Sequence, residues 1–114
     1  MDNPVLNSDE KWKNIDTHPM YQVSNLGRVR NRRGLIMKPW IINSGYYVLK
    51  LSEGGRNYTN FLIHRLVALH FIDNTNPDVL VEVNHKNGDK LNNTVTNLEW
   101  VTSSQNKKHA LFSG

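Results

Sequence analysis

One histidine and two asparagines in the last third of the chain have side chains and a spacing that could support hydrolytic chemistry. His85 comes first, Asn97 lies 12 positions later and Asn106 lies 21 positions later. A neutral imidazole can take a proton from water, and a neighbouring amide can hold the ring in the productive tautomer. A divalent ion beside them would stabilise the leaving 3′-oxygen. The three residues therefore suit hydrolysis of a phosphodiester bond, with His85 as the general base.

The asparagines of this region also have ordinary structural interpretations. The stretch NGDKLNN is typical of turns, because asparagine tolerates the left-handed region and bonds to its own backbone. Asn92 and Asn93 are assigned to that role. Asn97 on its own could cap the end of a strand. The joint spacing with His85 and Asn106 is what favours a catalytic set.

The elements that must hold these residues follow the order strand, loop, strand, helix. An apolar stretch predicts a strand over residues 79–83 that leads into His85, and Gly88 is the obvious turn residue of the loop. The stretch NLEWVT predicts a second short strand or extended piece, with Trp100 in the core. Thr102 offers a hydroxyl N-cap for a final helix.

A hairpin and a helix precede this motif. Residues 46–51 alternate between apolar and polar side chains, a Gly-rich turn follows, and residues 57–63 are the predicted partner strand. From His64 the apolar spacing changes to that of a helix, which ends before Asp73. His64 and His70 lie on or beside this helix, and a hydrogen-bonded structural histidine is the favoured interpretation of both.

A shorter hairpin is predicted further upstream. Residues 21–23 alternate, residues 24–27 break the pattern, and alternation resumes through Arg28 and Arg30. Gly27 is expected to adopt a positive φ in the turn, and the two arginines are expected to share one face. Small antiparallel hairpins, a helix and a C-terminal ββα motif together predict an α+β fold.

Basic residues are concentrated in and after this hairpin. The chain has 14 Lys plus Arg against 10 Asp plus Glu, and Asp and Glu are absent from Thr17 to Ser52. A local basic patch is the usual footprint of binding to a phosphate backbone, and a solvated face is the ordinary alternative. The predicted DNA-binding patch consists of Arg28, Arg30, Arg32, Arg33 and Lys38.

Composition and length limit the remaining possibilities. A chain of 114 residues fits one domain, or two small modules that share a core. The absence of cysteine excludes disulfides and thiolate zinc sites. No apolar run approaches the roughly 20 residues needed to cross a bilayer, and the N-terminus lacks the order of a secretory signal. We therefore expect a cytoplasmic protein without a membrane partner.

Several ordered blocks of sequence point to one family. They are WKNIDTHPMYQVSNLGRVRN, YYVLKL with HRLVALHFI, VNHKNGDKLNN, NLEWVT and SSQNKKHA, from about Lys11 to Leu111. In this order and spacing they resemble the HNH endonucleases of the phage and intron homing type. The resemblance implies a ββα-metal fold and metal-dependent cleavage of double-stranded DNA, in a bacterial or phage-infected cell. It divides the chain into a flexible N-terminus over 1–10, a DNA-binding module over 11–40 and a nuclease domain over 41–114.

The resemblance also implies roles for individual residues. His85 matches the general base, and Asn97 matches the residue that orients its ring. Asn84 and Asn106 match metal ligands for Mg²⁺ or Mn²⁺, although many relatives carry an aspartate where this chain has Asn84. His109 lies three residues past Asn106 on the same helix face, where it would contact the scissile phosphate or the metal, with solvent exposure as the alternative.

Two other classes of function stay open at this point. A non-catalytic DNA-binding module would use the hairpin of Arg28 and Arg30, keep the C-terminal half as a scaffold, and carry Asn84 as a sign of lost activity. An interaction protein of phage assembly would only borrow the fold. As a nuclease, a monomer would hold one active site and nick one strand, whereas a homodimer could cut both.

Overall fold

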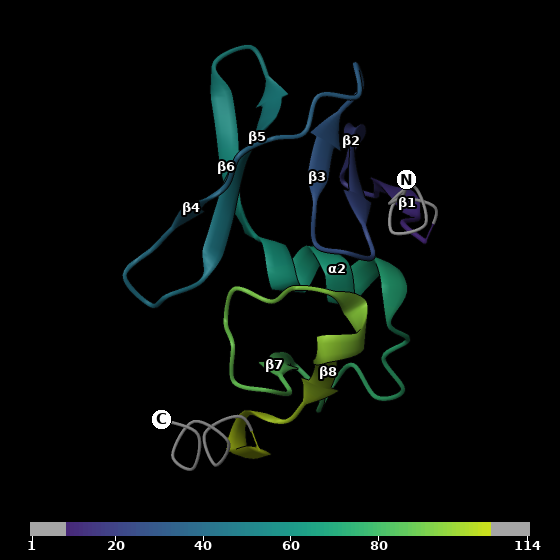
Figure 1. The fold of residues 1–114 in the computed structure, drawn as a ribbon, viewed down its shortest axis with the longest axis vertical. Helices are drawn as coiled ribbons and strands as arrows, with labels where there is room; N and C mark the ends of the chain where they lie inside the picture. The colour runs from purple at the N-terminus through teal and green to yellow at the C-terminus, as the bar shows by residue number, and fades with distance from the viewer. Residues whose placement is uncertain (1–8, 106–114) are drawn as a thin grey trace, which may run out of the picture.

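The computed structural model of the protein describes residues 9–105. Short antiparallel sheets surround a central helix, so the predicted α+β class is confirmed (Figure 1). Most of the predicted flexible N-terminus, and both Asn106 and His109, lie outside the described residues. Within residues 9–105 no helix is long and apolar enough to cross a membrane.

The first sheet contains strands β1 (Trp12–Ile15), β2 (His18–Ser24) and β3 (Val29–Asn31), paired in the antiparallel order β1-β2-β3. Val23 pairs with Val29, and both side chains are fully buried. The predicted hairpin is β2 and β3. Strand β1 was not predicted, because only its last residue is buried and its sequence therefore shows no alternation.

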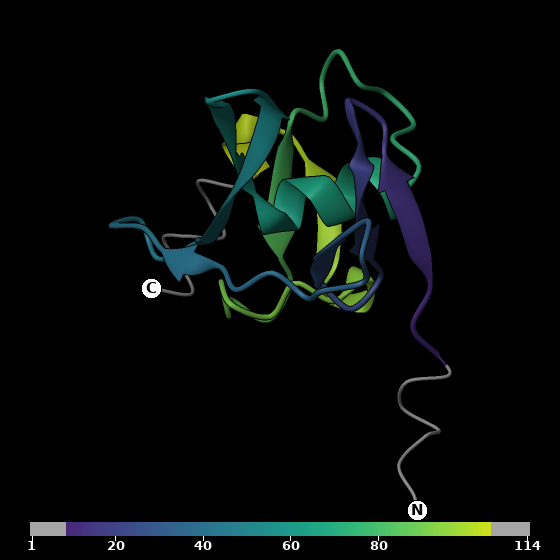
Figure 2. The same ribbon diagram turned by 90° about the horizontal axis from the view of Figure 1, so that it is seen from above.

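The second sheet is built on a long hairpin that projects from the body of the molecule (Figures 1 and 2). Strands β5 (Tyr47–Gly54) and β6 (Asn57–Leu62) form this hairpin, and the short strand β4 (Trp40–Ile41) pairs with β5 at its edge. The observed strands match the predicted ones to within a few residues. Leu49 and Leu51 of β5 are buried, whereas most of β6 is exposed.

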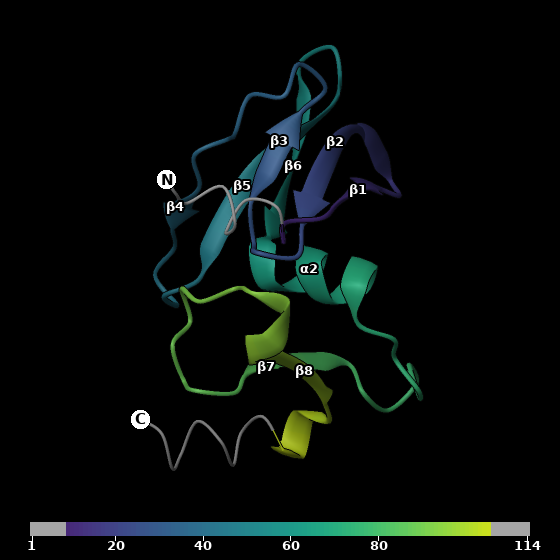
Figure 3. The same ribbon diagram turned by 45° about the vertical axis from the view of Figure 1, so that its right-hand side comes forward.

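Helix α2 (Ile63–Phe71) follows β6 directly and lies at the centre of the molecule. Figures 1 and 3 show it between the two sheets on one side and the C-terminal strands on the other. Ile63, Leu66, Val67 and Ala68 are buried on this helix, so its apolar residues face partners on both sides. This arrangement makes α2 the element that the other layers share.

The C-terminal motif contains strand β7 (Glu82–His85), the 3₁₀ helix η1 (Val95–Asn97) and strand β8 (Leu98–Val101). The predicted strand over residues 79–83 was wrong in position, and β7 begins three residues later. Residues 79 and 80 instead close a turn, because both of their amides donate to the carbonyl of Asn76. Trp100 is half-buried and packs against the core, with its indole N–H donating to the Ile72 carbonyl.

The last described residues begin a helix with the predicted hydroxyl cap. The Gln105 amide donates to Thr102 Oγ1 at 3.1 Å, and the Thr102 amide donates back to Gln105 Oε1 at 2.9 Å. These reciprocal bonds form a capping box, which satisfies two helix-end donors at once.

One apolar core joins most of these elements. Its members come from both sheets, from α2 and from the C-terminal strands, so the predicted modules 11–40 and 41–114 share a single core. The cluster consists of Ile15, Val23, Val29, Leu49, Leu51, Ile63, Leu66, Val67, Ala68, Val83 and Leu98.

Candidate active site

His85 is the last residue of β7, where its backbone pairs with Leu98 of β8. Its side chain packs against two other rings. The ring centroid lies 4.9 Å from that of His64 and 5.8 Å from that of Tyr46, and the residue is only 4% exposed. The strand therefore fixes the backbone while the neighbouring rings restrict the rotation of the imidazole.

An asparagine from the following loop holds the imidazole of His85. Asn93 Oδ1 lies 2.7 Å from His85 Nε2, and Asn93 is itself buried. Because an amide oxygen can only accept, Nε2 carries the proton, and the lone pair of the neutral ring is on Nδ1. From the sequence, Asn93 was assigned to turn chemistry, since nothing local distinguishes it from Asn92.

The side chain of Asn97 hydrogen-bonds to the loop that follows His85. The prediction had it contact the His85 ring. Its Oδ1 accepts the Asn87 amide at 3.1 Å, and its Nδ2 donates to the Asn92 carbonyl at 2.9 Å. Its own carbonyl accepts the Lys86 amide at 2.7 Å. Because its side-chain amide both accepts from and donates to the loop backbone, Asn97 fixes the loop that carries Asn93. Asn93 in turn contacts the imidazole.

Asn84 precedes His85 and is also buried. Its Nδ2 donates to Glu99 Oε2 at 2.8 Å, across the β7–β8 pair in which the two residues are direct partners. Because Nδ2 is used in the bond to Glu99, Oδ1 is the atom of the Asn84 side chain that could coordinate a cation. The sequence analysis did not single out Glu99, since its role depends on strand register.

His64 is the second histidine of the site. Its ring stacks on Tyr46 with centroids 4.7 Å apart, and its Nδ1 is buried without a hydrogen-bond partner among the described residues. Burial, with smaller effects from His85 and Arg65, lowers the pKa of His64 to about 3. His64 is thus neutral near pH 7, but the predicted hydrogen-bonded role fits only His70, whose Nδ1 donates to Leu66 and whose Nε2 accepts from Asp16.

Tyr46 and Lys90 cover the rings from the outer side. The Lys90 ammonium lies 5.0 Å from the Tyr46 ring centroid and donates to the Ser44 carbonyl at 2.9 Å. The site thus has a cationic group above its aromatic layer. Neither residue was predicted, because they reach the site from separate loops.

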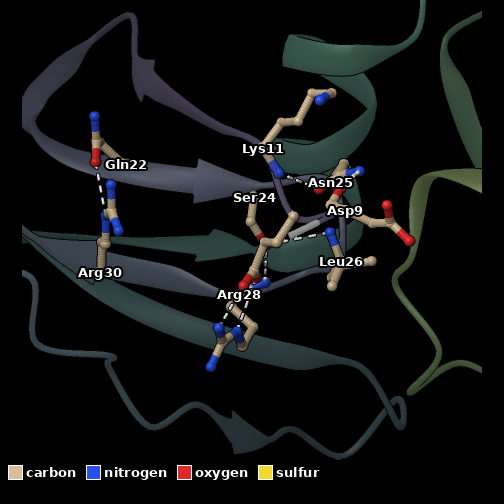
Figure 4. Close-up of polar contacts among 9 residues, drawn as sticks. Asp9, Lys11, Gln22, Ser24, Asn25, Leu26, Arg28 and Arg30 are labelled. Atoms are coloured by element: carbon tan, nitrogen blue, oxygen red, sulfur yellow. Dashed lines mark hydrogen bonds and ion pairs between the residues drawn. The ribbon is translucent and has the colours of Figure 1, made fainter. Parts of the chain in front are cut away.

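The predicted basic patch has its first two members on one face of the N-terminal sheet, as expected. Arg28 and Arg30 both lie over the Trp12 ring, at 5.7 and 4.1 Å from its centroid. Arg28 forms a two-pronged ion pair with Glu10, which lowers the pKa of that carboxyl. Arg30 Nε donates to Gln22 Oε1 at 2.7 Å (Figure 4). The remaining members, Arg32, Arg33 and Lys38, are exposed.

The geometry brings Asn84, His85 and Asn97 into one region, whereas the arginines lie on a separate sheet. The other predicted site residues, Asn106 and His109, lie outside the described part of the chain. Within residues 9–105 no group of three or more His, Asp or Glu side chains could hold a metal ion.

Comparisons with known proteins agree with this geometry. A model of the NUMOD4 motif matches residues 10–52, and a model of the HNH endonuclease family matches residues 61–108. The DNA endonuclease I-HmuI of Bacillus phage SP01 is 40% identical over 106 residues, which are 91% of this chain and 59% of that protein. An uncharacterized HNH endonuclease of Acanthamoeba polyphaga mimivirus is 41% identical over 104 residues, 91% of this chain and 31% of that protein.

A solved structure described as DNA binding and cleavage by the HNH homing endonuclease I-HmuI superposes with a TM-score of 0.79 at 38% identity. The match covers 90% of this chain and 58% of that chain. The chain therefore contains a region of the HNH endonuclease family over residues 61–108, with a NUMOD4 motif over residues 10–52 ahead of it. It spans less than two thirds of the length of these relatives.

The low pKa of His64 makes the stability of the fold depend on pH. In the unfolded chain this histidine binds a proton below about pH 6.5. In the folded chain it binds a proton only near pH 3. The free energy of unfolding should therefore fall with decreasing pH, by up to about 1.4 kcal/mol per pH unit from His64 alone. His64→Phe, which keeps a ring in the stack, should remove that part of the slope. Urea unfolding of both proteins from pH 7 to pH 4 measures it, and equal slopes would contradict the assignment.

Proposed function

We propose that this chain is a metal-dependent endonuclease that hydrolyses phosphodiester bonds of double-stranded DNA, with His85 as the general base. The buried imidazole with Nε2 bonded to Asn93 carries the proposal, because a general base has to be held in one tautomer and one orientation. The relatives described as DNA endonucleases give the same substrate class. The protein would encounter its DNA substrate inside a bacterial or phage-infected cell.

In this mechanism each of three protein residues has a separate role in one hydrolytic step. His85 Nδ1 takes a proton from a water molecule, and the resulting hydroxide attacks the scissile phosphorus. The bond between phosphorus and the 3′-oxygen breaks, and the 3′-oxygen leaves with the electron pair. Asn93 holds the ring through Nε2 and stabilises the imidazolium that forms, while Asn97 keeps the loop of Asn93 in place.

The residues fit a divalent metal ion such as Mg²⁺ or Mn²⁺. Asn84 and Asn106 would hold it through hard oxygen donors, and the Asn84–Glu99 bond already directs Oδ1 of Asn84 away from Glu99. When bound, the ion would stabilise negative charge on the leaving 3′-oxygen. The nearby carboxylate of Glu99 adds a negative charge that the neutral Asn84 lacks.

The N-terminal sheet would bind the DNA backbone. Arg28 and Arg30 are preorganised over Trp12, so they would lose little side-chain freedom on contact with phosphate. Arg32, Arg33, Lys38 and His109 would extend the contact. One chain holds one HNH region, so a monomer would nick one strand and a homodimer could cut both.

A catalytically inactive DNA-binding module is the second candidate. The neutral Asn84 favours it, because an amide binds a cation less strongly than the aspartate that many relatives carry. A buried and hydrogen-bonded His85 favours the nuclease, because a scaffold does not need this ring in one tautomer. Activity on plasmid DNA separates the two.

Replacement of His85 tests the nuclease directly. His85→Ala should reduce cleavage of supercoiled plasmid by about 10² to 10⁴, because that is the usual contribution of a general base. Its affinity for DNA in EDTA should stay within a few-fold of wild type, since the base adds little to ground-state binding. Cleavage assays with Mg²⁺, Mn²⁺ or EDTA and a matched binding assay measure both. A variant that cuts like wild type would remove His85 from the mechanism.

Replacement of the two arginines tests the DNA-binding face. Arg28→Ala with Arg30→Ala should weaken binding and flatten its dependence on salt, by about one unit of slope for each phosphate that the variant no longer binds. Arg65→Ala is the matched control, because it also removes a positive charge, but its guanidinium donates to Val81 and lies near Trp100. Binding isotherms at several salt concentrations measure the slopes. Equal slopes for the double variant and wild type would assign the arginines to a solvated face.

The Asn84–Glu99 bond makes a specific prediction about the metal. Asn84→Asp should place a second carboxylate against Glu99, so the metal-free protein should lose stability while the Mg²⁺ concentration for half-maximal cleavage falls. Adding Glu99→Gln should restore the stability, because the glutamine amide can donate to the new carboxylate. Asn106→Ala should raise the Mg²⁺ requirement. Thermal unfolding in EDTA and Mg²⁺ titrations of activity measure these effects, and coincident titration curves would exclude both asparagines as ligands.

A further inference from the structure

The turn between β2 and β3 lies against the loop that carries Asn93. The Val95 amide donates to the Asn25 carbonyl at 2.8 Å, which joins the N-terminal sheet to η1. A Cβ atom on Gly27 would lie 2.9 Å from Asn93 Cβ and 3.0 Å from the Asn93 carbonyl oxygen. Figures 1 and 3 show this turn beside the segment that leads into η1. The N-terminal module therefore touches the residue that holds the His85 ring.

We propose that the turn of residues 24–27 is a positioning element of the active site, which sets the place of Asn93 and through it the orientation of the His85 imidazole. The proposal rests on the proposed nuclease function. It gives the N-terminal module a role in the chemical step, in addition to DNA binding.

The turn is stiff enough to act in this way. Ser24 is fully buried, and its hydroxyl accepts the amides of Leu26 and Arg28 at 3.2 Å each. Asn25 ties the turn to the segment before β1, because its Oδ1 accepts the Lys11 amide at 2.8 Å and its Nδ2 donates to the Asp9 carbonyl (Figure 4). The turn is thus fixed by bonds that do not involve Asn93.

Glycine at position 27 meets two requirements at once. Its φ of +87° lies in the region that favours glycine, and its missing side chain lets Asn93 approach the backbone. A side chain here would push Asn93 and lengthen its 2.7 Å contact with His85 Nε2. A misplacement of about 1 Å at a catalytic group can cost about 10²-fold in rate.

The chain contains a matched control for the glycine substitution. Gly34 has a φ of +83°, and its amide closes a turn on the Asn31 carbonyl just as the Gly27 amide closes one on the Ser24 carbonyl. A Cβ atom at Gly34 would meet nothing within 4 Å. Gly27→Ala and Gly34→Ala therefore carry the same backbone cost, and only the first presses on Asn93.

The experiment compares these variants by single-turnover cleavage, by DNA affinity in EDTA, and by the ¹⁵N ring signals of His85 in the metal-free protein. Gly27→Ala should cleave roughly 10- to 100-fold more slowly than Gly34→Ala, with DNA affinity within about three-fold of it. Its His85 ring signals should leave the Nε2–H tautomer that wild type and Gly34→Ala share. Equal rates and equal ring signals for the two variants would overturn the proposal.

Val95→Pro provides a second variant that decides the question if Gly27→Ala does not fold. Val95 is the first residue of η1, and the preceding Thr94 is extended, so proline fits the backbone and removes the amide that bonds to Asn25, while its ring replaces the Val95 side chain against the core. It should slow cleavage and disturb the His85 ring in the same way, and wild-type behaviour in both would overturn the proposal. If the wild-type protein cuts no DNA, the nuclease function fails while the ring signals still test the positioning role.

Discussion

The imidazole of His85 is buried, and its Nε2 contact with Asn93 decides which ring nitrogen can take a proton. The surrounding structure maintains this contact from several directions. Strand pairing of β7 with β8 fixes the backbone of His85, and Asn97 binds both sides of the intervening loop. The turn at Gly27 limits where Asn93 can move. Elements from both halves of the chain thus surround a single hydrogen bond.

Burial also controls the charge of the site. His64 lies beside His85, and desolvation lowers its pKa so far that it stays neutral near pH 7. A neutral neighbour would add no repulsion to the imidazolium that the proposed mechanism forms on His85. Asn84 likewise avoids an uncompensated charge, because its amide can donate to Glu99, whereas an aspartate there would repel it without a metal.

The sequence predicted those features that depend on local pattern. Alternation located β5 and β6, helical spacing located α2, and the hydroxyl of Thr102 located the final cap. It placed His85 at the end of a strand, although it began that strand three residues too early, because an apolar run does not reveal where a turn is hydrogen-bonded. The predicted Gly27 turn has the expected positive φ.

The features that were missed depend on contacts between distant segments. Asn93 is one of two adjacent asparagines in a turn-forming loop, and only the fold shows that one of them reaches the imidazole. The role of Glu99 depends on the β7–β8 register, and that of Tyr46 on how its loop packs over α2. Gly27 could be recognised as a turn residue, but its approach to Asn93 could not. Because the N-terminal sheet and the strands beside His85 share one apolar core, the module proposed to bind DNA and the proposed catalytic base belong to one packed unit.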